Sequence, residues 1–173
     1  MSFLPIVLTD HDSVSAEIFI AAPCSRVFEA LVKREHALAW GNNSRFQITE
    51  WEMDARIGGK WRFVSQERSA AGQLNSAPFE HHGEILEFQP PHLLVYSWFA
   101  NWHAEPAYQT TVRWDLRAVV GGTRLRLDHS GLAFLTGACE AYAQGWPGLL
   151  LGLKNFLESH PADRAETIAI QSS

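Results

Sequence analysis

His129 is the residue whose type and position point most directly to chemistry. It follows Leu125 and Leu127 at two-residue spacing, so in a strand all three side chains share one apolar face. A neutral imidazole on such a face would bond a ligand oxygen or act as a general base. The alternative is a structural role, in which His129 bonds a neighbouring backbone or helix group and fixes the end of the strand.

The other histidines do not form a metal-binding pattern. His81 and His82 are adjacent in a predicted strand, so their side chains point to opposite faces and cannot easily share a metal. His103 and Glu105 share a predicted loop and would need further ligands from elsewhere. Because no set of His, Cys, Asp and Glu has ligand spacing, we predict neither a metal nor a cofactor.

Motifs for covalent catalysis and phosphate binding are also missing from the sequence. There is no G-x-S-x-G motif, and Gly58-Gly59 and Gly121-Gly122 have the character of hairpin turns, not of a dinucleotide fingerprint. Cys24 and Cys139 each lie near a predicted helix start, where a thiolate is favoured, but we interpret both as packing residues. No catalytic residue is therefore predicted.

Aromatic residues are unusually frequent, with seven Trp and ten Phe in 173 residues. Such rings either line a cavity for a flat or apolar ligand or fill the core completely, and the sequence leaves both alternatives open. The residues predicted to line a cavity are Trp61, Phe63, Tyr96, Trp98, Trp114 and Trp146, together with Leu125, Leu127, His129, Leu150 and Leu153.

The elements that would position these side chains follow from hydrophobic periodicity. Alternating patterns predict strands near 13–20, 46–51, 60–66, 82–88, 93–99, 109–118 and 123–129. Helical spacing predicts short helices near 23–33 and 35–40 and a long one over about 138–159, disturbed at Gly145 to Pro147. Strands grouped between helices indicate an α+β fold, in which an antiparallel sheet of six to seven strands is covered by the last helix.

Length and composition limit the classes of partner. The 173 residues suit a single domain, with a core over about 13–159 and extensions at 1–12 and 162–173. The net charge of −5 and the lack of basic clusters argue against nucleic acid, and no apolar run is long enough to span a membrane. Two distant thiols and an N-terminus without a secretory pattern predict a cytoplasmic protein without a disulfide framework.

Several stretches together carry a family resemblance. They are IAAP and VFEAL in 20–31, IGGKW at 57–61, GEILE, PP and LVYSW in 83–98, GTRL and HSG in 122–131, and GW ahead of Leu150, Leu153 and Phe156 in 145–156. This ordered set resembles the START-like (SRPBCC) superfamily, and within it the family related to the C-terminal domain of the activator of Hsp90 ATPase. The resemblance implies a helix-grip fold, a curved sheet around a long C-terminal helix. It includes His129 in relatives of many activities, which favours the structural role for that residue.

Because this superfamily includes lipid carriers, cyclases and oxygenase domains, the fold alone leaves three functions open. The first is binding of a small hydrophobic or aromatic ligand in an apolar cavity, which we favour over catalysis. The second, implied by the resemblance, is a co-chaperone-like interaction, although the chain lacks the separate N-terminal domain of such co-chaperones. The third is a cavity enzyme of the hydrolase or cyclase kind that uses His129 or a carboxylate such as Glu50 or Glu84. A homodimer is also left open, because edge strands need cover.

Overall fold

The computed structural model describes residues 4–43, 45–75 and 77–161. In chain order the elements are β1 (Ile6–Thr9), β2 (Val14–Ile20), α1 (Cys24–Val32), α2 (Arg34–Trp40), β3 (Phe46–Met53), β4 (Lys60–Glu67), β5 (Phe79–Gln89), β6 (Leu93–Ala100), β7 (Thr110–Val119), β8 (Gly122–Ser130) and α3 (Ala138–Ser159). The predicted order of strand, two short helices, strands and long helix is confirmed. The predicted C-terminal extension from residue 162 lies outside the described residues.

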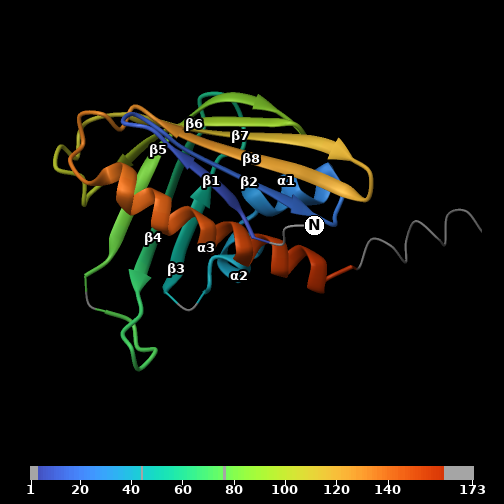
Figure 1. Cartoon of the computed structure of the whole chain (residues 1–173), viewed down its shortest axis with the longest axis horizontal. Coiled ribbons are helices and arrows are strands. Elements are labelled where there is room, and N and C mark those ends of the chain that lie inside the picture. Colours follow the sequence, from blue (N-terminus) through green and yellow to red (C-terminus); the bar gives the residue numbers. More distant parts are fainter. Residues whose placement is uncertain (1–3, 44, 76, 162–173) are drawn as a thin grey trace, which may run out of the picture.

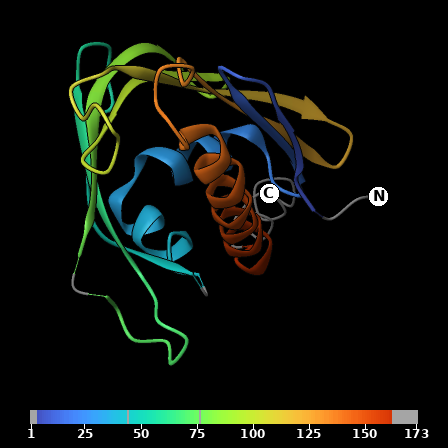
Figure 2. The same ribbon diagram turned by 60° about the vertical axis from the view of Figure 1, so that its left-hand side comes forward.

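The strands form one antiparallel sheet in the order β1-β2-β8-β7-β6-β5-β4-β3. It curves around α3, and α1 and α2 lie beside α3 on the same concave side (Figures 1 and 2). The helix-grip fold is therefore confirmed, with eight strands where the sequence predicts six to seven. The additional strand is β1, which pairs with β2 from Ile6 opposite Glu17 to Thr9 opposite Val14.

The two faces of the sheet differ as strand alternation predicts. The concave face carries the core, and the convex face carries ion pairs between neighbouring strands or within them. Arg113, for example, is exposed and pairs with Asp115 at 2.7 Å, while Val112 and Trp114 on either side of it are buried. These exposed pairs add little stability, but they keep the convex face polar.

Strand β3 departs from simple alternation in a way that affects the candidate site. The pairing of β3 with β4 shifts register between Ile48 and Glu50, which is a β-bulge. An extra residue reverses the side-chain alternation beyond it, so Ile48 and Trp51 are both buried and Glu50 points to solvent. Strict alternation over 46–51 would place Ile48 with Glu50 and opposite Trp51, and this expectation is wrong beyond the bulge.

Helix α3 covers the concave face along one apolar stripe. Tyr142, Trp146, Leu150, Leu153 and Leu157 recur at spacings of three and four residues, and all are buried. The helix is continuous through Pro147, so the predicted restart near Gly145 does not occur. Pro147 still removes one backbone hydrogen bond, and tertiary contacts on both sides of it hold the helix together.

Two helical glycines make a matched test of how closely α3 approaches α2. A Cβ at Gly152 would lie 2.4 Å from the backbone oxygen of Trp40, whereas a Cβ at Gly148 meets nothing within 4 Å. We expect Gly152→Ala to lower the free energy of unfolding by about 1–3 kcal/mol, because backbone must shift to make room. Gly148→Ala should raise it by about 0.5–1 kcal/mol through helix propensity. Urea unfolding measures the free energy of unfolding of both variants. Equal changes in the two would contradict the close approach of α3 to α2.

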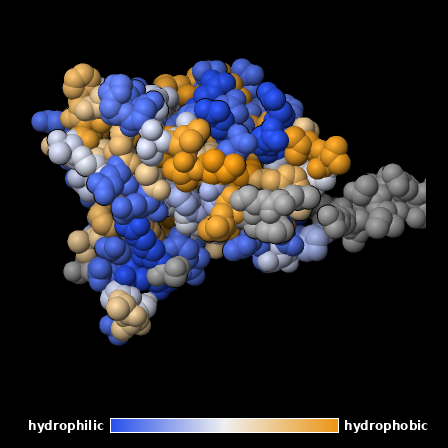
Figure 3. All heavy atoms as spheres, in the orientation of Figure 1, coloured by the Kyte–Doolittle hydropathy of each residue, from blue (hydrophilic) through white to orange (hydrophobic). Residues whose placement is uncertain are grey.

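An exposed apolar row follows the edge strand. Leu4, Ile6 and Leu8 are 65%, 58% and 67% exposed. Figure 3 shows hydrophobic side chains gathered over β1 on this face of the molecule. None of the described helices is long and apolar enough to cross a bilayer.

Candidate functional site

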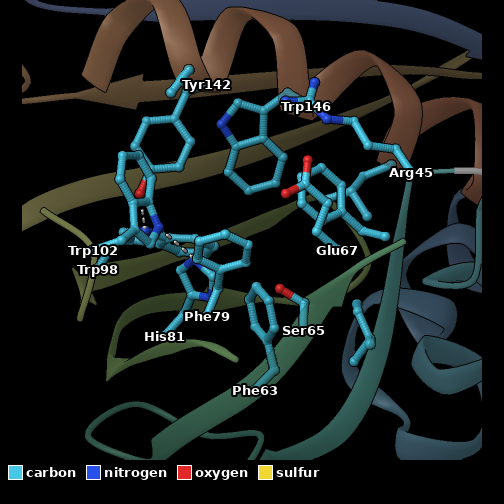
Figure 4. Close-up of a pocket in the computed structure, with 15 residues that line it drawn as sticks. Arg45, Phe63, Ser65, Glu67, Phe79, His81, Trp98, Trp102, Tyr142 and Trp146 are labelled. Carbon is cyan, nitrogen blue, oxygen red and sulfur yellow. Dashed lines mark hydrogen bonds between the residues drawn. The ribbon is translucent and has the colours of Figure 1, made fainter. Parts of the chain in front are cut away.

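A cavity of about 250 Å³ lies between the β3–β6 side of the sheet and the N-terminal half of α3. Figure 4 shows side chains of the sheet and of α3 converging on it from opposite sides. Figure 2 shows why space remains there: the sheet bends away from α3 at β3, β4 and β5, while α3 stays close to β1 and β2. The curvature of the sheet thus opens one side of the grip.

The lining changes from aromatic inside to charged at the mouth. The buried wall consists of Ile48, Phe63, Ser65, His81, Trp98, Tyr142 and Trp146. The partly or fully exposed rim consists of Arg45, Phe46, Glu67, Phe79, Trp102, Ala141, Gly145 and Leu149. A molecule seated here would contact mainly ring faces and edges, with polar groups only at a few defined points.

The structure separates the eleven residues predicted to line a cavity into two groups. Phe63, Trp98 and Trp146 line the 250 Å³ cavity. The other eight lie in the surrounding core and do not line it: Trp61, Tyr96, Trp114, Leu125, Leu127, His129, Leu150 and Leu153. Whether any of the eleven binds a ligand stays a prediction.

The space between β8 and α3, where the sequence predicted part of the cavity lining, is filled by side chains. Leu125 and Leu127 on β8 and Leu150 and Leu153 on α3 each have no exposed surface. Helix α3 stays close to β1 and β2, and these four side chains belong to one buried, close-packed cluster. Periodicity shows correctly that they face inward, but it does not say whether space remains beyond them.

Trp98 is the centre of the aromatic wall. It is 2% exposed, and its ring lies within about 6 Å of seven other rings. Its indole N–H donates to the Tyr142 hydroxyl at 2.8 Å, and that hydroxyl also bonds Nε2 of His103 at 2.7 Å. These two hydrogen bonds link β6, α3 and the loop after β6 at one end of the cavity.

His129 is fully bonded and has no lone pair left for chemistry. The indole N–H of Trp146 donates to its Nδ1 at 3.2 Å, so in the neutral ring the proton is on Nε2. Nε2–H then donates to the Thr110 hydroxyl at 2.8 Å, and that hydroxyl donates to the backbone oxygen of Trp98 at 3.2 Å. Burial holds the pKa of His129 well below its usual value. These bonds support the structural role over the role of a base.

His81 is bonded on one side only. It is 6% exposed, lines the cavity and stacks on Phe63 with ring centroids 4.4 Å apart. The indole N–H of Trp102 donates to its Nε2 at 3.2 Å, and burial lowers its pKa to about 3, so the ring is neutral. Its Nδ1 is buried and has no partner among the described residues. Leaving a buried donor unpaired costs about 1–3 kcal/mol.

The polar groups at the mouth and just inside it come from β4 and from the residue before β3. Ser65 and Glu67 follow Phe63 at two-residue spacing on β4, so all three face the cavity side. Arg45 precedes Phe46, the register partner of Glu67, so it lies on the same side of the mouth as Glu67, and it packs over the Phe46 ring at 4.9 Å (Figure 4). One cation and one anion at the rim leave the entrance without a net charge.

The carboxylates proposed for a cavity enzyme lie elsewhere. Glu50 is exposed on the convex face and bonds Arg62 at 2.7 Å, because the bulge in β3 turns it outward. Glu84 forms an ion pair with Lys60 across the β4–β5 register, on the same outer face. The suggestion that either is a cavity carboxylate is therefore wrong.

The thiols show no sign of activation. Cys24 is buried and is 3.4 Å from the Thr123 hydroxyl, which donates to its sulfur. Burial, with Asp10 and Asp12 nearby, raises the pKa of Cys139 and disfavours its thiolate. In the described part of the chain, no three His, Cys, Asp or Glu side chains are grouped to hold a metal ion.

Comparison with known proteins agrees with this architecture. Residues 21–158 match the family described as activator of Hsp90 ATPase homolog 1-like protein. The chain belongs to this family. The match runs from the end of β2 to the end of α3, so it includes both walls of the cavity. No curated protein matches the chain at a significant level.

Solved structures of several bacterial proteins share the fold. A Chromobacterium violaceum protein aligns with a TM-score of 0.72 at 22% identity and covers 85% of this chain and 97% of its own. A Rhodobacter sphaeroides protein gives 0.70 at 20% identity, with 90% and 99% coverage. The AHSA1-like protein from Aeromonas hydrophila gives 0.66 at 20% identity, with 86% and 94% coverage. These likenesses show that the fold is shared.

Sequence reasoning missed several cavity residues of this family member that it had the means to find. Tyr142 lies four residues before Trp146 on the helix, so helical spacing places both on one face. Ser65 shares the parity of Phe63, and His81 is one of two adjacent histidines of which one had to point inward. Trp102 and Arg45 lie outside regular elements, where no periodicity indicates direction.

Proposed function

We propose that this family member binds a small, flat and mostly apolar molecule in the cavity beside α3. The observation that supports it most is a 250 Å³ space whose buried wall is mainly aromatic. An apolar cavity of about 150 Å³ is enough to take benzene. A space of this size therefore suits one or two fused rings, and it lies just below the range of about 300–1,000 Å³ usual for drug-sized ligands.

The arrangement of polar groups favours binding over catalysis. Among the described residues of the cavity wall, no serine or cysteine is bonded to a base, burial raises the pKa of the Tyr142 hydroxyl, and the imidazole of His129 is committed to its neighbours. Ring faces provide a large contact area without directional demands, while a few polar groups orient the bound molecule. This is the chemistry of a binding site for an aromatic compound.

A larger side chain at Gly145 can block the cavity without the removal of any buried side chain. It lies on α3, lines the cavity, and a Cβ added to it meets nothing within 4 Å. We expect Gly145→Leu to fill the space and to weaken binding of a bicyclic aromatic probe such as naphthalene by at least tenfold, or about 1.4 kcal/mol. Replacing a helical glycine should at the same time preserve or raise stability.

Gly148→Leu is the matched control for this prediction. Gly148 is also helical and also has free space at its Cβ, but it does not line the cavity. Binding is measured by quenching of tryptophan fluorescence, since Trp98, Trp102 and Trp146 form part of the wall. If naphthalene binds the wild type and both variants equally, the cavity is not the binding site. If the wild type binds neither naphthalene nor a wider panel of one- and two-ring compounds, the proposed function fails.

A second function deserves a test because of the family to which the chain belongs. The family description names the activator of Hsp90 ATPase. The exposed row Leu4, Ile6 and Leu8 on the edge strand offers an apolar surface of the kind that binds other proteins. A pull-down with the middle domain of the chaperone, using wild type and Ile6→Lys, addresses this role. Capture of the wild type alone would support it, and capture of neither would count against it.

A further inference from the structure

One polar group in the cavity wall has no hydrogen-bond partner among the described residues. Four buried side-chain nitrogens have no hydrogen-bond partner in the described part of the chain: His36 Nδ1, Trp51 Nε1, His81 Nδ1 and His103 Nδ1. Of these four residues only His81 lines the 250 Å³ cavity. Trp51 lines a neighbouring space of only about 10 Å³, which has room for no more than a water. The 250 Å³ cavity is therefore where a bound organic molecule could complete such a group.

The hydrogen-bond pattern fixes which proton His81 offers. An indole nitrogen can only donate, so the bond from Trp102 requires a lone pair on Nε2 of His81. In the neutral imidazole the proton must then be on Nδ1, which makes the unpaired nitrogen a donor. Because His81 Nδ1 is buried, the ring must turn toward the cavity for this donor to reach an occupant.

The surroundings of this donor select against a charged partner. The His81 ring stacks on Phe63 and lies at a tilt to Trp98 with centroids 4.9 Å apart, so its neighbourhood is aromatic. Arg45 and Glu67, the charged residues of the lining, are at the mouth. An isolated anion in such a place would lose its hydration without gaining a counter-charge.

We propose that the cavity recognises a neutral one- or two-ring aromatic molecule bearing a hydrogen-bond acceptor, such as a ketone oxygen or a ring nitrogen, and that Nδ1–H of His81 donates to that acceptor. This inference rests on the proposed function, since it names the class of ligand for the same cavity. The hydroxyl of Ser65, on the neighbouring strand and also part of the buried wall, is placed to bond a second polar atom of the same ligand.

A pair of probes that differ in one group tests the proposal. 1-Indanone and indane are both bicyclic and differ by a carbonyl in place of a methylene. Dissociation constants for both are measured by tryptophan quenching for wild type, His81→Phe and His82→Phe. We expect the preference for 1-indanone over indane to fall by about tenfold in His81→Phe, the worth of one buried hydrogen bond. His82→Phe, which changes the exposed neighbour on the opposite face, should leave the ratio of the two dissociation constants unchanged.

The outcomes separate this inference from the function on which it rests. If both probes bind and His81→Phe leaves their ratio unchanged, the role of His81 is wrong while the binding function stands. If neither probe binds the wild type, both the function and the inference fail for ligands of this size. If His81→Phe does not fold, the NMR chemical shift of the imidazole Nδ1–H of the wild type is measured with each probe instead. It should move downfield with 1-indanone and not with indane, and equal shifts with both would overturn the proposal.

Discussion

Acidification from pH 7 to pH 5 is expected to destabilise this protein before its carboxylates begin to titrate. The cause is a group of histidines buried as neutral rings around the aromatic wall. Burial lowers the pKa of His81 to about 3, and it also lowers the pKa values of His103 and His129. A histidine in the unfolded chain has a pKa of about 6.5.

The sign of the effect follows from proton binding in the two states. Above pH 6.5 His81 is neutral in both the folded and the unfolded chain, so it adds no pH dependence. Below pH 6.5 the unfolded chain binds a proton that the folded protein does not, and stability therefore falls as the pH falls toward 3. At about 1.4 kcal/mol per pH unit, His81 alone costs about 2 kcal/mol by pH 5. His129 acts in the same direction.

The carboxylates affect stability at lower pH, so their contribution can be distinguished from that of the histidines. Hydrogen bonding from Arg62 lowers the pKa of Glu80, and hydrogen bonding from Lys33 lowers that of Glu29. A carboxylate with a lowered pKa contributes stability that is lost only as the pH falls through and below its ordinary value near 4.5. A decline between pH 6.5 and 5 therefore reports on the histidines.

Urea unfolding at half-unit intervals from pH 7.5 to 4.5 measures this dependence. His81→Phe should make the slope between pH 6.5 and 5 shallower by up to about 1.4 kcal/mol per unit. His82→Phe, which removes the exposed neighbour stacked on Phe99, should keep the wild-type slope. Identical slopes for the three proteins would contradict the assignment of His81 as a buried neutral ring.

Trp98→Ala is expected to be the most damaging single truncation in the aromatic wall. It removes a ring that is 2% exposed and that packs against rings from β4, β5, β6, β8 and α3. Truncation of a buried Trp costs about 3–5 kcal/mol, because the lost packing is added to the cost of the hole. The Tyr142 hydroxyl also loses the donor at 2.8 Å that helps to hold it against His103.

Trp102→Ala is the control for the size of the side chain. Trp102 lines the same cavity but is only partly buried, and its ring contacts His103 and Tyr142 at the rim. We expect it to cost less than half as much as Trp98→Ala in urea unfolding followed by circular dichroism. Equal losses would show that Trp98 is not the centre of this wall. The fold should survive Trp102→Ala, which also removes the indole donor from His81.

Local chemistry was enough to predict most of the architecture of this protein. Alternation over Thr123 to His129 and helical spacing from Leu149 to Leu157 reflect which side chains must leave water, and this depends on neighbours two to four residues apart. Phe63, Trp98 and Trp146, which the excess of aromatic residues marked as cavity candidates, lie in the cavity wall. The strand β1 was missed because four residues at an edge carry too little periodic signal.

The sequence by itself therefore determined the fold class, the order of the elements and the inward direction of the core residues. Only the tertiary structure decided where the cavity lies, because that depends on how far the sheet bends away from α3 at β3–β5. It also decided the state of each buried histidine. His129 is satisfied by Trp146 and Thr110 from distant segments, whereas His81 receives one partner and keeps one donor unpaired. Such partners come together through long-range packing, which no local spacing encodes.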